Sequence, residues 1–295
     1  MHARILFVVV AVLVSLLLSA CQSESTEPET PSTEIAQTLA EPTDPDPADV
    51  TQMAAAEAVP EPEPCTLTAG WDPWEPYHYI AAGSEVRGLD IEMIEAIANL
   101  ANCEVSFEQG NWSGLLNQLR NGNVDVMMGA TQIPERENFA HFSEPYREDS
   151  FMLYILQGEE ERVGNHSLEE LMQDGFRIGI TQGYYYGAEF DELQMRPELA
   201  DQIVDVSVGE MNFTHLLDGR IDGFLEHSPV ATAIKRRRGD TDPIVATELS
   251  IGGGPVTFMF SRESVDQEIV QRFNDALQEL KDSGEHERML SRYME

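Results

Sequence analysis

Residues 119–128 read LRNGNVDVMM, and residues 216–225 read LLDGRIDGFL. In both stretches a leucine-containing helix end is followed by glycine, and then by an apolar residue, an aspartate and a run typical of a strand. Gly122 suits the left-handed conformation in which many helices end. Any helix-to-strand loop can have this composition, but two such loops in matching places predict two lobes built in the same way.

The first stretch belongs to a longer alternation of strands and helices. We expect strands at 65–70, 103–107 and 124–128. Between them, Asp90 is the expected N-cap of one helix, and a second helix begins at Ser113. The order β-α-β-α-β is typical of a parallel sheet with helical crossovers.

A second unit of the same kind follows. We expect helices at 168–174, 186–194 and 210–218, with Ser167 as the cap of the first, and strands at 177–180, 204–206 and 221–225. The glycines at 252–254 indicate a flexible crossing before a strand at 256–260, and two helices, at 264–282 and 284–293, end the chain.

The chain would therefore cross twice between the lobes, near 152–156 and near 255–260. The first lobe is expected to comprise residues 65–154 and 255–295, and the second lobe residues 155–254. Two crossing segments make a hinge, and ligand sites commonly lie in such clefts. We predict a two-lobed α/β fold in which each lobe is a mainly parallel sheet flanked by helices.

The N-terminus has the pattern of a secretory signal peptide over residues 1–20. Arg4 precedes an almost wholly apolar run at 5–18, which is short for a permanent bilayer anchor. Cys21 directly after Leu-Ser-Ala resembles the lipobox of bacterial lipoproteins, which implies acylation of Cys21 and a lipid anchor in the membrane. The alternative is an ordinary signal peptide followed by a chance cysteine.

Residues 21–64 are predicted to be a tether. From residue 22 onward they contain 11 acidic residues and neither a basic nor an aromatic one. Such a segment buries too little apolar surface to offset its ordering entropy, so we expect it to be disordered. The whole chain has 18 Lys and Arg against 53 Asp and Glu, a formal net charge of −35. This charge disfavours nucleic acid as a partner.

Two cysteines remain when Cys21 is set aside. Cys65 and Cys103 each open a predicted strand. If the two strands are parallel neighbours, the sulfur atoms lie at the same level, and an oxidising compartment favours a disulfide. Two free buried thiols are the alternative.

Taken in order, residues 65–295 resemble the extracellular solute-binding proteins of polar-amino-acid ABC transporters, which have the type II periplasmic-binding fold. The motifs that carry the resemblance are Trp74-Glu-Pro-Tyr77, Gly88-Leu-Asp-Ile-Glu, Trp112-Ser-Gly-Leu-Leu, Gly122-Asn-Val-Asp125, Glu135-Arg136, Phe142-Ser-Glu-Pro-Tyr146, Gln182-Gly183, Gly219-Arg-Ile-Asp222 and Ser228-Pro229. The resemblance implies a monomer without a cofactor, on the periplasmic or cell-surface face of a bacterial membrane. It would pass a small carboxylate-bearing solute to a membrane permease.

The resemblance also implies a binding site. The position of Arg136 clamps the α-carboxylate of the ligand in the family, and the position of Thr131 binds the same ligand. An arginine fork grips a carboxylate with two hydrogen bonds, and the small Gly129 lets backbone donors approach the anion. Trp74 and Trp112, with Tyr77 as a weaker candidate, would hold the body of the ligand. The plainer alternatives are a surface ion pair for Arg136 and ordinary core packing for the tryptophans.

The second lobe departs from the family pattern in two places. After Thr181 and Gly183 the family has small hydroxyl residues, where this chain has Tyr184 and Tyr185 followed by Tyr186. These rings either narrow the cleft or pack at a helix start.

The second departure is His227, which replaces an aspartate that pairs with the α-ammonium group of amino-acid ligands. Glu226 is adjacent, but strand alternation would point it to the opposite face. A ligand with a carboxylate and no amine is therefore an open alternative.

Three further functions were weighed. The seven histidines lack metal-ligand spacing, so we expect no metal site. An enzyme similar to cyclohexadienyl dehydratase, with Glu226 and His227 as an acid–base pair, is one alternative. A tethered sensor that signals to a membrane partner is another. The basic cluster Lys235 to Arg238 is expected to close a helix, where cations meet the helix dipole favourably.

Overall fold

The structure is a computed structural model, and it describes residues 63–294. The predicted signal peptide, the acylation at Cys21 and nearly all of the predicted tether lie outside these residues. In the described part, no helix is both long enough and apolar enough to cross a membrane.

The described chain alternates strands and helices through most of its length. The strands are β1 (Cys65–Trp71), β2 (Tyr79–Ile80), β3 (Val86–Arg87), β4 (Cys103–Gln109), β5 (Val126–Ala130), β6 (Ala140–Phe142), β7 (Arg147–Leu156), β8 (Ile178–Thr181), β9 (Ile203–Val206), β10 (Gly223–His227) and β11 (Ile244–Ser261). The helices are α1 (Leu89–Leu100), α2 (Trp112–Arg120), α3 (Pro134–Glu137), α4 (Glu160–Val163), α5 (Leu168–Gln173), α6 (Ala188–Gln194), the 3₁₀ helix η1 (Pro197–Gln202), α7 (Met211–Leu217), α8 (Ser228–Arg237), α9 (Gln267–Asp282) and α10 (Glu285–Met294).

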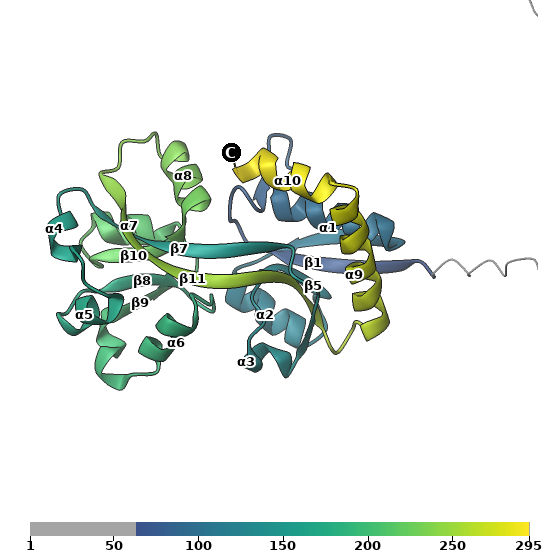
Figure 1. Cartoon of the computed structure of the whole chain (residues 1–295), viewed down its shortest axis with the longest axis horizontal. Coiled ribbons are helices and arrows are strands. Elements are labelled where there is room, and N and C mark those ends of the chain that lie inside the picture. Colours follow the sequence, from purple (N-terminus) through teal and green to yellow (C-terminus); the bar gives the residue numbers. More distant parts are fainter. Residues whose placement is uncertain (1–62, 295) are drawn as a thin grey trace, which may run out of the picture. The chain divides into compact units, whose positions relative to one another are not determined.

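Two lobes share one hydrogen-bonded sheet path, in the order β4-β1-β5-β11-β7-β10-β8-β9. The first lobe contains β4, β1 and β5, which are parallel, and the second contains β10, β8 and β9, which are also parallel. Strands β7 and β11 pair antiparallel with each other and run from one lobe into the other (Figure 1). Within the described residues, the chain passes from the first lobe to the second along β7 and returns along β11. These two strands form the connection between the lobes, and the cleft lies beside them.

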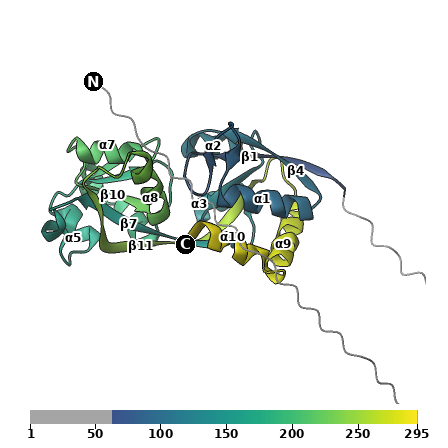
Figure 2. The same ribbon diagram turned by 90° about the horizontal axis from the view of Figure 1, so that it is seen from above.

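Amphipathic helices cover the sheets. Helices α9 and α10 return to the first lobe and pack with α1 (Figure 2). The buried face of α9 carries Val270, Phe273 and Leu277, spaced as a helical apolar stripe. The capping box predicted at Ser167 is present in α5, with Glu170 as its partner. The basic turn predicted after Pro229 ends α8.

Gly122 has a φ of 72°, as predicted for the residue that follows helix α2. Two other expectations were wrong. Asp90 does not cap α1, because Gly88 takes the cap position and Asp90 lies buried inside the first turn. The glycines at 252–254 do not precede a strand but lie within β11, which begins at Ile244. A register shift against β7 falls there, and glycine tolerates the irregular backbone that the shift requires.

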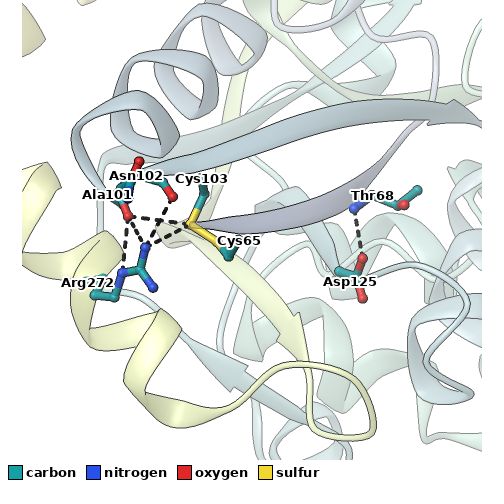
Figure 3. The surroundings of a disulfide bond; sticks show 7 residues. All are labelled: Cys65, Thr68, Ala101, Asn102, Cys103, Asp125 and Arg272. Carbon is teal, nitrogen blue, oxygen red and sulfur yellow. Dashed lines mark hydrogen bonds between the residues drawn. A yellow bond between two sulfur atoms is a disulfide. The ribbon is translucent and has the colours of Figure 1, made fainter. Parts of the chain in front are cut away.

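The predicted disulfide between Cys65 and Cys103 is present (Figure 3). The two residues are directly paired in the parallel register of β1 and β4, with 4.4 Å between their Cα atoms. The guanidinium of Arg272 donates to the carbonyl of Ala101 beside the bridge. The bridge therefore fixes the beginning of β1 at the point where the described chain starts.

Candidate binding site in the cleft between the lobes

A cleft lies between the lobes, beside the crossing strand β7. Residues of the first lobe, of β7 and of the loop after β8 line it: Asp72, Trp74, His78, Trp112, Gly129, Thr131, Arg136, Asp149, Phe151, Tyr184 and Tyr185. The lobes touch across it, and the remaining space holds no more than a few water molecules. The structure is thus the closed arrangement of the two lobes.

Arg136 is a buried cation at one end of the cleft, with 5% of its surface exposed. Its guanidinium donates to the carbonyl of Thr131 at 3.0 Å and to that of Gly183 at 2.9 Å. No carboxylate of residues 63–294 lies within ion-pair distance of it. Burial lowers the pKa of Arg136 to about 10, still well above neutral pH, so the charge persists.

Gly183 connects the two lobes at this end. Its carbonyl also accepts a 2.9 Å hydrogen bond from the indole of Trp112. Gly183 has a φ of 80°, and a β-carbon there would lie 3.2 Å from the Trp112 ring. Glycine is needed at this position both for its backbone conformation and for the close approach of the indole.

The amide of Gly129 has a partner inside the protein. It donates a 2.9 Å hydrogen bond to the hydroxyl of Tyr146. Gly129 lines the cleft as expected, but its N–H is already bonded and does not point to the cleft as a free donor.

Aromatic rings occupy the middle of the cleft. The ring of Tyr184, from the second lobe, lies edge-on to Trp112 at 5.5 Å and to Trp74 at 6.0 Å between centroids. Its hydroxyl donates a 2.7 Å hydrogen bond to Asp72 of the first lobe. Tyr186 has a different role, since it is buried and its hydroxyl accepts from the backbone N–H of Thr181. Both predicted alternatives therefore occur: Tyr184 and Tyr185 line the cleft, and Tyr186 packs in the core.

A second buried arginine, Arg147, pairs with Asp149 of the cleft lining. Arg147 donates to both carboxylate oxygens of Asp90, at 3.0 and 2.9 Å, and forms an ion pair with Asp149. Its guanidinium lies 4.1 Å from the ring centroid of Tyr77. Burial disfavours the charge, but Asp149 and Asp90 outweigh that effect and hold the pKa of Arg147 well above its usual value.

Glu226 and His227 both contact the first lobe without lining the cleft. Glu226 accepts from the indole of Trp74 at 3.1 Å and from the backbone N–H of His227 at 2.8 Å. His227 shares a 2.8 Å hydrogen bond with the hydroxyl of Tyr77. The expectation that alternation separates the two side chains fails, because β10 ends at His227 and the Glu226 carboxylate turns back onto the next amide.

The protonation states of these two residues follow from their burial. Burial raises the pKa of Glu226 to about 7, although the bonds from His227 and Trp74 oppose the shift. Burial, together with the nearby Arg147, lowers the pKa of His227 to about 3. The imidazole is therefore neutral near pH 7 and offers no charge to a ligand.

The structure brings together seven of the twelve residues predicted for the site. Trp74, Trp112, Gly129, Thr131, Arg136, Tyr184 and Tyr185 line the cleft, whereas Tyr77, Thr181, Gly183, Glu226 and His227 do not. Sequence reasoning missed Asp72, His78, Asp149 and Phe151. Of these four, Asp72 could have been predicted, since it lies between the first strand and the predicted ligand contact Trp74. No cluster of three or more potential metal ligands occurs among residues 63–294.

Comparisons with known proteins agree with this architecture. Residues 67–295 match the family described as bacterial extracellular solute-binding proteins, family 3. The chain is 24% identical over 221 residues to the arginine-binding extracellular protein ArtP of Bacillus subtilis, across 75% of this chain and 82% of that protein.

Solved structures share the fold. An ancestral arginine-binding protein bound to arginine superposes with a TM-score of 0.65 at 22% identity, across 78% of this chain and 98% of that one. An ancestral amino acid-binding protein, a precursor of cyclohexadienyl dehydratase, gives 0.63 at 22% identity, across 78% and 96%. These likenesses confirm the predicted two-lobed α/β fold.

Proposed function

The chain belongs to family 3 of the bacterial extracellular solute-binding proteins, and we propose that it captures a small carboxylate-bearing solute, an amino acid or a related acid, in the cleft between its lobes. The solute would contact both lobes only when they are closed, so binding would shift an open–closed equilibrium towards the closed state. Delivery of the solute to an ABC transporter permease, from a lipid anchor at Cys21, completes the proposal.

The main support for this proposal is that Arg136 is buried without an ion-pair partner among the described residues. A buried guanidinium without a paired carboxylate is costly, because burial disfavours the charge. Glu135, which lies beyond ion-pair distance, offsets only part of that cost, and the pKa of Arg136 stays lowered. The chain has 53 acidic residues, and Glu135 and Glu137 flank Arg136 in the sequence, yet no described carboxylate lies within ion-pair distance of its guanidinium. A ligand carboxylate could accept the same donors that now reach the carbonyls of Thr131 and Gly183.

The cleft also has features for the rest of a small solute. Trp74 and Trp112 supply apolar faces, and Asp72 and Asp149 add carboxylates to the same lining. A solute with one anionic end and a compact body fits such an arrangement. The relative ArtP, an arginine-binding protein by name, supports amino acids as the first compounds to test.

Binding is favoured over catalysis by the placement of Glu226 and His227. The enzyme considered from the sequence needs these two residues as an acid–base pair facing the substrate, and neither lines the cleft. We therefore expect a bound acid to be recovered unchanged. Proton NMR of the acid, followed over hours with the protein present, checks this, and the appearance of a product would favour the enzyme.

The direct test is a thermal-shift and calorimetric screen of amino acids and related acids against the wild type and Arg136→Ala. A ligand at about a hundred times its dissociation constant adds about 2.7 kcal/mol of stability, enough to detect. Loss of the charge-assisted fork, worth about 1.5–3 kcal/mol, should weaken binding at least tenfold. Arg87→Ala, which removes an exposed arginine of the first lobe, is the matched control. Equal affinities for wild type and Arg136→Ala would remove Arg136 as the clamp.

A further inference from the structure

Tyr184 occupies the space that a solute would be expected to take. Its ring packs edge-on against both Trp74 and Trp112, with centroid distances of 6.0 and 5.5 Å and interplanar angles of 84° and 77°. It reaches this place from the second lobe, while both tryptophans belong to the first. The ring is therefore an occupant of the aromatic part of the cleft that the protein itself supplies.

The hydroxyl of Tyr184 supplies a hydrogen-bond donor to Asp72, a carboxylate of the cleft lining. It donates to Asp72 at 2.7 Å, and Asp72 is 7% exposed. His78 approaches the same carboxylate at 3.8 Å, and the Asp72 backbone carbonyl also bonds the His78 ring. A buried carboxylate that loses a hydrogen-bond donor bears the full cost of its desolvation. Whatever replaces Tyr184 must therefore supply a donor to Asp72.

The closed cleft has no room for both Tyr184 and an amino acid, since only a few water molecules fit beside the ring. We propose that Tyr184 is an internal occupant of the cleft, and that the solute must displace it and present an ammonium group to Asp72. This inference rests on the proposed function and narrows it from carboxylate-bearing acids to α-amino acids.

The proposal accounts for His227 in place of the family's aspartate. His227 is bonded to Tyr77 and lies outside the cleft lining. Asp149 does line the cleft, but Arg147 already holds it. Asp72, whose donor belongs to a side chain on the opposite lobe, is the carboxylate that a solute can take over. Recognition of the ammonium group thus moves from strand β10 of the second lobe to the loop after β1 in the first.

The first experiment measures the affinities of L-glutamine, L-histidine, L-arginine and the 2-oxo acid of each for the wild type and three variants. Tyr184→Phe keeps the ring but loses the donor to Asp72, so the internal occupant competes less well. Because apparent affinity scales with the fraction of molecules that are free to bind, we expect at least one amino acid to bind about tenfold more tightly. Tyr79→Phe removes a tyrosine hydroxyl of β2, which does not line the cleft, and should match the wild type.

Asp72→Asn tests the ammonium site. An amide carries no charge to pair with the ammonium group, so the preference for each amino acid over its 2-oxo acid should fall at least tenfold. Retention of that preference in Asp72→Asn, or an affinity of Tyr184→Phe within twofold of the wild type, would overturn the inference. A wild type that prefers 2-oxo acids would overturn it too, while leaving the proposed carboxylate-binding function intact.

A second measurement needs no solute. Tyr184→Ser removes the ring that covers Trp74 and Trp112, so the tryptophan emission of the free protein should shift to longer wavelength. Titration of a tight-binding amino acid into the wild type should perturb the same emission. If Tyr184→Ser leaves the spectrum of the free protein unchanged, Tyr184 is not the internal occupant, whether or not the protein binds any acid.

Discussion

Arg136 and Arg147 are both buried and both lie near aromatic rings, yet their partners differ. Arg147 has the carboxylates of Asp90 and Asp149 within bonding distance. Arg136 has only backbone carbonyls, although its guanidinium lies 5.5 Å from the Trp112 ring as a further favourable contact. The pKa of Arg147 is held above its usual value, whereas that of Arg136 is lowered to about 10.

The difference separates a structural charge from a functional one. Arg147 joins helix α1 to the crossing strand β7 through Asp90, and so fixes the floor of the cleft. Arg136 forms no ion pair with the described residues, and we propose that an arriving anion offsets the remaining cost of its burial. In a chain of net charge −35, a buried cation without a carboxylate at ion-pair distance is unusual, and this is the reason for proposing Arg136 as the anion-binding residue.

Replacing Arg147 is the largest expected effect. Arg147→Met leaves the carboxylates of Asp90 and Asp149 buried without a cation, which should lower the free energy of unfolding by about 3–5 kcal/mol. Urea unfolding at pH 7.5 measures it, and adding Asp90→Asn should restore part of the loss. Arg177→Met, at an ion pair with 39% of the arginine side chain exposed, should cost less than about 1 kcal/mol. Equal losses for the two arginines would contradict the structural role of Arg147.

Glu226 is the anionic counterpart of Arg136, because no cation of the described residues pairs with it. Its pKa is raised to about 7 by burial. Since the value in the unfolded chain is near 4.5, protonated Glu226 stabilises the folded protein below about pH 4.5. That contribution is lost as the pH rises through about 7.

Glu226→Gln should therefore be more stable than the wild type at high pH. The variant stays neutral and its amide oxygen can still accept from Trp74 and from the His227 amide. The gain in free energy of unfolding should be small near pH 4.5 and grow to about 3 kcal/mol by pH 8. Urea unfolding of both proteins across this range tests it, and a gain that does not depend on pH would show that folding does not raise the pKa of Glu226.

Most of the fold followed from local sequence patterns. Apolar spacing and the glycines at helix ends predicted most of the longer elements of both lobes, because these preferences act within a few residues. They did not predict the short strands β2, β3 and β6, or that the crossing segments β7 and β11 are long paired strands. The disulfide followed because two cysteines opened strands that are parallel neighbours. Arg136 and the two tryptophans came from motifs that resemble the family, and the structure places all three in the cleft lining.

What sequence reasoning missed depends on contacts between distant residues. An aspartate at a helix start is typical both of an N-cap and of a buried ion pair. Asp90 belongs to the second kind because it pairs with Arg147, which is 57 residues further along the chain. Tyr184 and Asp72 are 112 residues apart and on different lobes. No local pattern records such pairs. The position of Asp72 beside Trp74 could have suggested it as a cleft residue, but its hydrogen bond with Tyr184 could not be predicted.

Replacing Arg136 should have the smallest effect on stability, in contrast with Arg147. Arg136→Met removes a buried charge that has no carboxylate to leave behind, while the carbonyl of Gly183 keeps its bond from Trp112. The carbonyl of Thr131 loses one donor, but Thr131 is only partly buried, so water can replace it. We expect the free energy of unfolding without solute to change by no more than about 1 kcal/mol, in either direction, because relief of the buried charge offsets the lost hydrogen bonds. A loss near that of Arg147→Met would show that Arg136 stabilises the fold itself. If Arg136→Met unfolds like the wild type but no longer binds any acid, Arg136 serves ligand binding and not the stability of the fold.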